Sequence, residues 1–241
     1  KNHFYKNIQR KLDKNDVVIV KNFLNQKTKN NIFKFLKKSF FSRKDIRKSG
    51  EFKYLQKDYK RLDIGDAYIN SRVSRFLLYT EWNKKNLKLF NNINKIIDLR
   101  NKVINTSKIN FEYKFKGYDS KNYKFCDMVR MIQYPTGGGF LASHNDKEYL
   151  YPKQMINVLV PFSKKTNKKI NLFPKFKTGG LFYIKNNKKI DIEEYLDIGD
   201  LIFHNQNIEH GVSSIDSYEN FKLKEFCGRI TLNFSIGKFF I

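Results

Sequence analysis

Acidic residues and cysteines are scarce in this chain, and long apolar stretches are missing. Asp and Glu number 23 against 48 Lys and Arg, which gives a formal net charge of +25 over 241 residues. The two cysteines are too few for a disulfide framework, so we expect a reducing, cytoplasmic setting. No apolar run is long enough to span a membrane. Residues 1–16 contain no apolar stretch of the kind that marks a signal peptide.

The excess of positive charge permits several interpretations. A strongly basic chain can bind nucleic acid or another polyanion. Most of the excess is Lys rather than Arg, however, and the chain is also rich in Asn, Ile, Phe and Tyr, which AT-rich codons encode. Genome composition can therefore supply much of the charge. A polyanion, an anionic small substrate and a purely compositional origin all remain open on charge alone.

The first part of the chain predicts helices with one short strand. Residues 1–13 are typical of a short helix or arm, and residues 17–20 are a run of β-branched residues typical of a strand. Asn25 or Thr28 caps the next helix, whose apolar face ends at Phe40. Hydrophobic residues make up 40% of the chain, which is enough for one sizeable core.

Two further stretches complete the prediction for the helical part. Residues 42–62 are polar and basic and indicate an irregular loop, either a lid over a site or a solvated excursion. From Asn70 or Ser71 to Val103 the apolar spacing fits a helix. From Phe111 onward the pattern changes to short strands separated by Gly-containing turns. Helices first and strands after favour an α+β fold.

A possible metal site follows the strand-like run MVRMIQY. His144 and Asp146 lie in the segment FLASHNDKEYL, and residues two apart in a strand point to the same face. A His from a neighbouring strand would complete two histidines and one carboxylate on one face of a metal. Such a set leaves positions open and suits Fe(II) that binds a cosubstrate and oxygen. His210, in GDLIFHNQNIEHGV, is the candidate.

An anion site is predicted on the last strand, GRITLNFSI. The planar guanidinium of Arg229 can hold a carboxylate with two hydrogen bonds. An Arg that points into a barrel needs an anion, whereas an ordinary surface Arg is the alternative. Thr231 and Asn233 share its face of the strand. The Thr231 hydroxyl can help to hold the same carboxylate, and Asn233 is a candidate substrate contact.

In their order along the chain, these segments resemble the Fe(II)/2-oxoglutarate-dependent oxygenases. Each feature alone is weak, but the ordered set, which runs from about Val129 to Phe234, is specific. The features are the turn YPTGGGF, the strand INVLVPFS, the Gly-Gly strand at 179–180, the Gly-Asp turn at 199–200, His-Gly-Val at 210–212 and Arg-x-Thr at 229–231. The resemblance implies a double-stranded β-helix (jelly-roll, cupin-like) core with buttressing N-terminal helices.

The resemblance also implies a domain organisation and a ligand. It implies one oxygenase domain over residues 1–241, mainly helical over 1–110 and a jelly-roll core over 111–241. The family places its second His directly before Gly-Val, ten residues after the Gly-Asp turn, which selects His210. His204 is then a structural or pocket-rim His. The cosubstrate implied is 2-oxoglutarate, with O2, and Arg229 holds its distal carboxylate.

Three other side chains are candidates for the pocket. Tyr134 and Arg130 share a face of MVRMIQY. Tyr134 is a candidate hydroxyl donor to 2-oxoglutarate and Arg130 a candidate substrate contact, with a core Tyr and an edge Arg as the alternatives. Asn157, in INVLVPFS, either lines the pocket as a substrate contact or satisfies the backbone.

The retained Asp146 bears on the reaction. Related halogenases replace this carboxylate by a small residue, so its presence favours hydroxylation or a related oxidation. The nucleic-acid dealkylase branch carries Arg-x-Asn-x-Thr-x-Arg on the last strand, whereas here Thr231 precedes Asn233 and the second Arg is absent. We therefore expect a hydroxylase acting on a small metabolite, amino acid or natural-product intermediate. A protein or nucleic-acid hydroxylase or demethylase is the alternative, and a non-catalytic jelly-roll binding module is a third.

Overall fold

The computed structural model describes residues 2–42, 45–46, 60–65, 69–80, 87–109, 112–116, 118, 121–146 and 156–240. Its helices are α1 (Asn2–Asp13), α2 (Gln26–Ser42), α3 (Leu87–Val103) and the 3-10 turn η3 (Glu193–Tyr195). Its strands are β1 (Val18–Val20), β2 (Asp45–Ile46), β3 (Lys60–Gly65), β4 (Ser71–Thr80), β5 (Lys108–Ile109), β6 (Glu112–Tyr113), β7 (Tyr123–Tyr134), β8 (Gly139–His144), β9 (Ile156–Pro161), β10 (Lys164–Lys165), β11 (Lys175–Phe176), β12 (Gly180–Lys185), β13 (Lys188–Asp191), β14 (Leu201–Asn205), β15 (His210–Ile215) and β16 (Arg229–Phe240).

One large sheet organises these strands. Its main path is β1-β14-β9-β16-β7-β4-β8-β15-β12-β13, with β3 paired to β4 and β6 paired to β7 off the path. Every neighbouring pair along the path is antiparallel. β4 links one half of the sheet, β1-β14-β9-β16-β7, to the other half, β8-β15-β12-β13. Its first residues pair with β8 and its later residues pair with β7. The sheet therefore continues from the long strands into the smaller group formed by β8, β15, β12 and β13.

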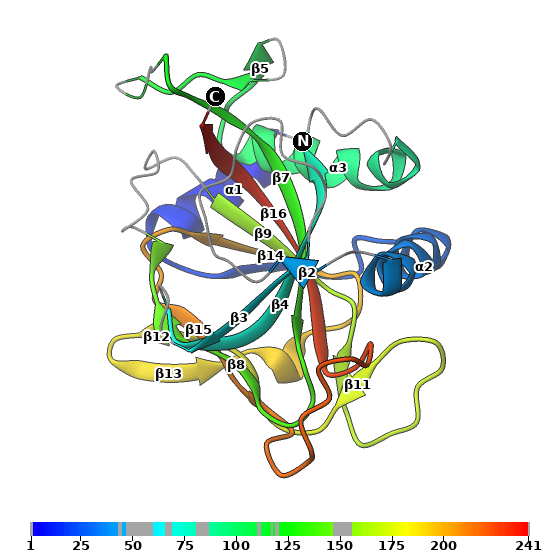
Figure 1. Ribbon diagram of the computed structural model, residues 1–241. Helices are drawn as coiled ribbons and strands as arrows, with labels where there is room; N and C mark the ends of the chain where they lie inside the picture. The colour runs from blue at the N-terminus through cyan, green and yellow to red at the C-terminus, as the bar shows by residue number, and fades with distance from the viewer. Residues whose placement is uncertain are drawn as a thin grey trace.

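Alternate residues of the long strands face two different cores. In β16, Ile230 and Leu232 belong to a helix-side core shared with α1, α2 and α3. In Figure 1, α1 and α3 pass behind the long strands and α2 lies to one side of them. The odd-numbered residues of β16 point the other way, because successive strand residues alternate. That side holds the barrel core, made of Val73, Ile132, Tyr134, Leu141, Leu159, Phe176, Leu181, Ile192, Leu196, Ile202, Val212 and Ile215. The barrel core draws residues from both halves of the sheet.

Several local predictions for the N-terminal part are confirmed. Residues 2–13 form α1, and β1 lies within the run predicted as a strand. The cap of α2 is Asn25 rather than Thr28, because the Asn25 Oδ1 accepts the backbone N–H of Thr28 at 2.9 Å. Such a cap satisfies one of the free N–H groups of the first turn and contributes about 1 kcal/mol.

The helix predicted from Asn70 is wrong for its first part. Ser71–Thr80 forms strand β4, and only Leu87–Val103 is helical. Val73 belongs to the barrel core and Phe76 to the helix-side core, so β4 is buried on both faces. In a strand, residues three apart point to opposite faces. When both faces are buried, both residues can be apolar, and the spacing of three then resembles the spacing of a helix although the backbone is extended.

The N-terminal 110 residues also contribute to the sheet. β1 pairs with β14, and β4 pairs with β7 and β8, so the core strands extend into the part predicted as mainly helical. Within the stretch 42–62, Asp45–Ile46 and the first residues of β3 are strands, while 43–44 and 47–59, on which the lid was predicted, lie outside the described residues. None of the helices in the described ranges combines the length and hydrophobicity needed to cross a membrane.

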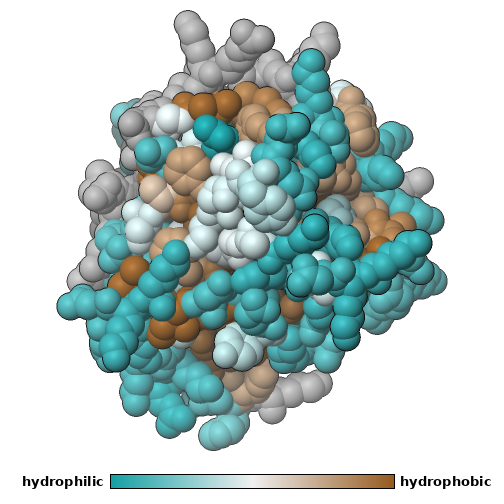
Figure 2. All heavy atoms as spheres, turned by 90° about the horizontal axis from the view of Figure 1, so that it is seen from below, coloured by the Kyte–Doolittle hydropathy of each residue, from teal (hydrophilic) through white to brown (hydrophobic). Residues whose placement is uncertain are grey.

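The two cysteines and one molecular face complete the description. Cys126 lies near the start of β7 opposite Gly237, and Cys227 just precedes β16, so they sit at opposite ends of one strand pair. They form no disulfide. On the face shown in Figure 2, hydrophilic residues cover most of the described surface, and hydrophobic ones form small separate areas.

Candidate active site

Two strand ends meet at the candidate metal site. β8 ends at His144 and β15 begins at His210, and the two residues lie opposite each other in the antiparallel pair. Their ring centroids are 4.4 Å apart, and Asp146 Oδ1 lies 3.8 Å from Nε2 of His144. One donor atom from each of the three residues lies within 4.8 Å of the others. The fold thus brings together the three side chains that the sequence predicts as ligands.

Backbone carbonyls orient both imidazoles. Nδ1 of His144 lies 3.0 Å from the Ala142 oxygen, and Nδ1 of His210 lies 2.9 Å from the Ile208 oxygen. A carbonyl oxygen only accepts hydrogen bonds, so each Nδ1 carries the proton and each Nε2 keeps its lone pair. Contacts of this kind fix the orientation of metal-ligating histidines. Both rings are therefore arranged to offer Nε2 as a metal donor.

Asp146 is held in place from two sides. Its backbone N–H donates to the Gln206 oxygen at 3.0 Å. The side-chain amide of Asn157, on β9, donates to Asp146 Oδ2 at 2.7 Å. This contact leaves Oδ1 on the side of His144. Asn157 thus lies at the site, and its observed partner is the Asp146 carboxylate, which neither prediction for Asn157 named.

His204 lies beside the site but does not belong to the converging set. It is buried on β14 opposite Asn157, and its ring centroid is 4.5 Å from that of His210. His204 and His210 also border a pocket lined by apolar side chains such as Leu181 and Ile202. The converging donor atoms in the described residues come from His144, Asp146 and His210. His204 is therefore a buried residue that lines the pocket next to the converging set.

Burial keeps the imidazoles of the site neutral. It lowers the pKa of His210 to about 4, and the neighbouring His204 adds to the shift. Burial is also the main cause of the lowered pKa values of His144 and His204. A neutral imidazole is the form that binds metal, because the protonated ring has no lone pair to offer.

Arg229 is buried in the barrel, so the alternative of a surface Arg is wrong. It opens β16 opposite Tyr134 of β7, and the residue is only 1% exposed. Its Nε donates to Glu193 Oε2 at 2.8 Å. Nη1 and Nη2 are buried and have no hydrogen-bond partner among the described residues. Buried donors without partners are rare and costly, so the open side of the guanidinium is fitted to an acceptor.

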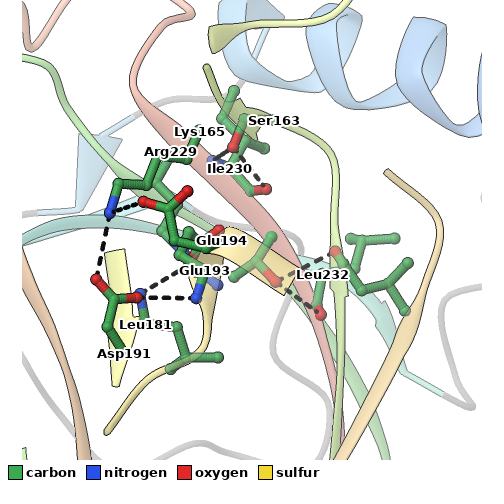
Figure 3. Close-up of polar contacts among 11 residues, drawn as sticks. Ser163, Lys165, Leu181, Asp191, Glu193, Glu194, Arg229, Ile230 and Leu232 are labelled. Carbon is green, nitrogen blue, oxygen red and sulfur yellow. Dashed lines mark hydrogen bonds and ion pairs between the residues drawn. The ribbon is translucent and has the colours of Figure 1, made fainter. Parts of the chain in front are cut away.

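Glu193 is a site residue that the sequence does not reveal. It lies on η3, is 2% exposed, and also accepts the backbone N–H of Leu181 at 2.7 Å (Figure 3). A buried carboxylate requires a positive partner, which Arg229 provides. The only sequence signal is the acidic pair in DIEEYLDIGD, and such pairs are usually solvated.

Tyr134 and Thr231 flank Arg229. The guanidinium carbon of Arg229 lies 5.6 Å from the centroid of the Tyr134 ring, which is buried. Thr231 is buried on the same face of β16, and its hydroxyl donates to the Val160 oxygen at 3.2 Å. The hydroxyl proton of Thr231 is therefore engaged with β9 in this arrangement, and Tyr134 covers the guanidinium.

Further positive charge lies on the same side of the sheet. Arg130 Nη2 donates to Asn233 Oδ1 at 3.4 Å across the β7–β16 pair. Arg75, on β4, forms an ion pair with Asp63. Burial raises the pKa of Tyr134, and the charges of Arg229, Arg75 and Arg130 oppose that rise. Arg75 was not identified from the sequence, because it falls where a helix was predicted.

Comparison with known proteins gives matches at the level of structure only. No family model matches the sequence, and a search of curated proteins gives no match. The alpha-ketoglutarate-dependent epimerase SnoN from nogalamycin biosynthesis matches with a TM-score of 0.59 at 7% identity, over 98% of this chain and 83% of that one. A Pseudomonas putida prolyl-4-hydroxylase matches with a TM-score of 0.56 at 11% identity, over 97% and 98%. A Trichoplax adhaerens prolyl hydroxylase, solved with a peptide from hypoxia inducible factor, matches with 0.53 at 12% identity, over 98% and 90%.

These matches confirm the predicted fold. The chain has the α+β, double-stranded β-helix architecture of the Fe(II)/2-oxoglutarate oxygenases, which the ordered motifs indicated. With identities of 7–12% in these three matches, the likeness concerns the fold. Chemistry has to be inferred from the side chains of the site.

The lowered pKa of His210 generates a prediction for the metal-free protein. An unfolded His has a pKa of about 6.5, whereas folded His210 has about 4, so the unfolded chain binds protons first as the pH falls. The stability contributed by neutral His210 is present above about pH 6.5 and is lost toward pH 4. The unfolding free energy of the parent should therefore fall between about pH 7 and pH 5. In His210→Asn that fall should be smaller by about 2 kcal/mol, as measured by urea titration at each pH.

The control for this experiment is His3→Asn, because His3 is exposed on α1. It should leave the pH dependence of unfolding as in the parent protein. A pH dependence of His210→Asn equal to that of the parent would contradict the burial of a neutral imidazole at this position.

Proposed function

We propose that this protein is an Fe(II)- and 2-oxoglutarate-dependent oxygenase in which His144, Asp146 and His210 hold the metal. The observation that carries the proposal is the convergence of one donor atom from each residue within 4.8 Å. Two imidazoles and one carboxylate form the facial set of non-heme Fe(II) oxygenases and leave positions open for other ligands. The fixed tautomers of both histidines support the same assignment.

The cosubstrate site in this proposal is the open side of Arg229. Its two buried nitrogens without partners suit the distal carboxylate of 2-oxoglutarate, which accepts two parallel hydrogen bonds. Bound Fe(II), with 2-oxoglutarate and O2, supplies the oxidising power, and 2-oxoglutarate leaves as succinate and carbon dioxide. The buried ring of Tyr134 lies beside the guanidinium, with 5.6 Å between the guanidinium carbon and the ring centroid. Asn157 holds the Asp146 carboxylate, and retention of that carboxylate favours hydroxylation or a related oxidation.

For the substrate we favour a small metabolite, amino acid or natural-product intermediate with an anionic group. Arg130 and Arg75 supply positive charge on the barrel side of the sheet, near Tyr134. Charge of this kind attracts and orients an anionic ligand. Among the proteins of similar fold, SnoN belongs to natural-product biosynthesis, whereas the prolyl hydroxylase was solved with a peptide. A protein or nucleic-acid substrate is therefore the second candidate.

The metal assignment predicts different effects for two neighbouring histidines. His210→Ala should abolish stoichiometric Fe(II) binding, because it removes one of three donors. His204→Ala should retain it, although His204 is buried only 4.5 Å from His210 between ring centroids. Anaerobic metal analysis after gel filtration measures the occupancy. Full occupancy in His210→Ala together with loss in His204→Ala would show that His204 is the ligand.

The cosubstrate assignment predicts the effect of Arg229→Lys. Lysine keeps a positive charge beside Glu193 but cannot form the two-pronged contact of a guanidinium. Truncating one partner of a buried, hydrogen-bonded charge pair costs roughly 2–5 kcal/mol. Lysine keeps the charge and loses only the two-pronged geometry, so the 2-oxoglutarate affinity should fall by at least about tenfold, toward the lower end of that range. Anaerobic calorimetry of the Fe(II)-loaded protein measures it, with the Fe(II) affinity itself as the control. An unchanged 2-oxoglutarate affinity would remove Arg229 from the site.

The oxygenase activity and its substrate are tested together. The Fe(II)-loaded protein is screened against metabolite pools, and succinate release is followed with a mass gain of one oxygen in a metabolite. We expect an anionic small molecule to stimulate succinate release, and basic peptides and oligonucleotides to leave it unchanged. Stimulation by a peptide or oligonucleotide with an oxidised product would favour the second candidate. Failure of the protein to bind either Fe(II) or 2-oxoglutarate would favour a binding module without catalysis.

A further inference from the structure

Glu193 is held in place by several contacts, and one of them is with Arg229. Its Oε2 accepts Arg229 Nε at 2.8 Å and the Leu181 backbone N–H at 2.7 Å. Its own backbone N–H donates to Asp191 Oδ1 at 2.9 Å. The side chains of Glu193 and Arg229 are each only 1% exposed. The carboxylate position is therefore set by β12, by the end of β13 and by β16 together.

Gly180 leaves the space that this carboxylate needs. A Cβ atom at position 180 would lie 2.7 Å from both Cβ and Cγ of Glu193, which is closer than two carbon atoms can approach. The backbone of Gly180 also has a φ of +123°, which residues with a side chain rarely adopt. The Gly-Gly strand thus has a concrete role, because the second glycine lets the Glu193 side chain pass over β12.

Ion pairs of Lys165 hold the turn around Glu193 from its exposed side. Lys165 pairs with Asp191 at 3.2 Å and with Glu194 at 2.7 Å, on either side of Glu193 in the chain (Figure 3). Asp191 in turn holds the Glu193 backbone N–H. Although Glu193 lies in the connection between β13 and β14, residues on both sides of it in the chain are held by ion pairs with Lys165.

The contacts of Arg229 are uneven around its guanidinium. The Nε edge is occupied by Glu193, while Nη1 and Nη2 are buried without a partner among the described residues. A guanidinium is planar and rigid, so a contact on Nε determines the direction of the remaining donors. A buried ion pair is weak support for stability, and two orphaned donors make this pair weaker still. The arrangement is better explained by a ligand than by stability.

We propose that Glu193 is a positioning residue, which holds Arg229 by Nε and directs Nη1 and Nη2 toward the distal carboxylate of a five-carbon 2-oxo diacid. This inference rests on the proposed function and adds a residue to it. The contribution of Glu193 lies in its geometry rather than in its charge, because a second carboxylate near the bound anion repels it. Removing the charge while keeping the oxygen should therefore preserve binding, and moving the oxygen should weaken it.

The test compares 2-oxoglutarate with 2-oxopentanoate, which has the same five carbons but a methyl group in place of the distal carboxylate. The dissociation constant of 2-oxopentanoate divided by that of 2-oxoglutarate, both measured anaerobically by calorimetry on the Fe(II)-loaded protein, gives a ratio that isolates recognition of that carboxylate. Glu193→Gln keeps an oxygen for Nε and should retain the parent ratio within threefold. Glu193→Asp keeps the charge but is one methylene shorter, and should reduce the ratio at least tenfold, with the 2-oxopentanoate affinity unchanged.

Two further variants complete the design. Glu194→Gln is the matched control, because it makes the same exchange of carboxylate for amide one residue away and keeps an oxygen that accepts from Lys165, so it should keep the parent ratio. Gly180→Ala displaces the Glu193 side chain without altering either charge, so it should lower the ratio as Glu193→Asp does. Circular dichroism shows whether each variant folds. If Glu193→Asp does not fold, Gly180→Ala tests the same displacement of the Glu193 carboxylate.

The outcomes separate this inference from the function on which it rests. A parent protein that binds both 2-oxo acids equally would remove the proposed function and the role of Glu193 with it. A parent that prefers 2-oxoglutarate, with that preference retained in Glu193→Asp and Gly180→Ala, would overturn the positioning role alone. Loss in Glu193→Gln with retention in Glu193→Asp would show that the charge matters, which also overturns the proposal.

Discussion

The register of β16 between β7 and β9 determines which side of the sheet the polar side chains of these long strands face. Arg229 faces Tyr134 and Asn233 faces Arg130 only because the strands pair in this register. The intervening residues, such as Ile230 and Leu232, are fully buried against the helices. A slip by one residue would move Arg229 into the helix-side core and the isoleucine into the barrel, reversing both faces at once. Burial on both faces therefore specifies the register strongly.

The candidate metal site depends on the other half of the sheet. β8 and β15 bring His144 and His210 opposite each other, and the register between them becomes irregular immediately after His210. Such irregularities bend a strand and redirect a side chain, and they recur beside active sites. Asp146 lies beyond the end of β8, where its backbone N–H donates to the backbone oxygen of Gln206. The site thus combines two residues of a strand pair with one residue that follows the end of β8.

The sequence predicted what depends on local pattern and missed what depends on tertiary burial. His144, Asp146 and His210 were recognisable because strand alternation and motif order place them. The strand β4 was read as a helix because Val73 and Phe76 are buried on opposite faces, and Arg75 was missed with it. Glu193 gave no signal, because an acidic residue in a polar turn resembles a solvated one until the fold places Arg229 beside it.

Two buried Arg–carboxylate pairs show how a structural contact differs from a binding one. Arg100 pairs with Asp127 on the helix side, where Tyr113 and Asn101 also accept from the guanidinium, so one nitrogen, Nη1, is left without a partner in the described part of the chain. Among the described residues, Arg229 has a hydrogen-bond partner at Nε, whereas Nη1 and Nη2 have none. Desolvating a guanidinium is costly in both places. In the helix-side pair neighbouring groups offset most of that cost, whereas in the barrel an anion that occupies the open side of Arg229 would do so.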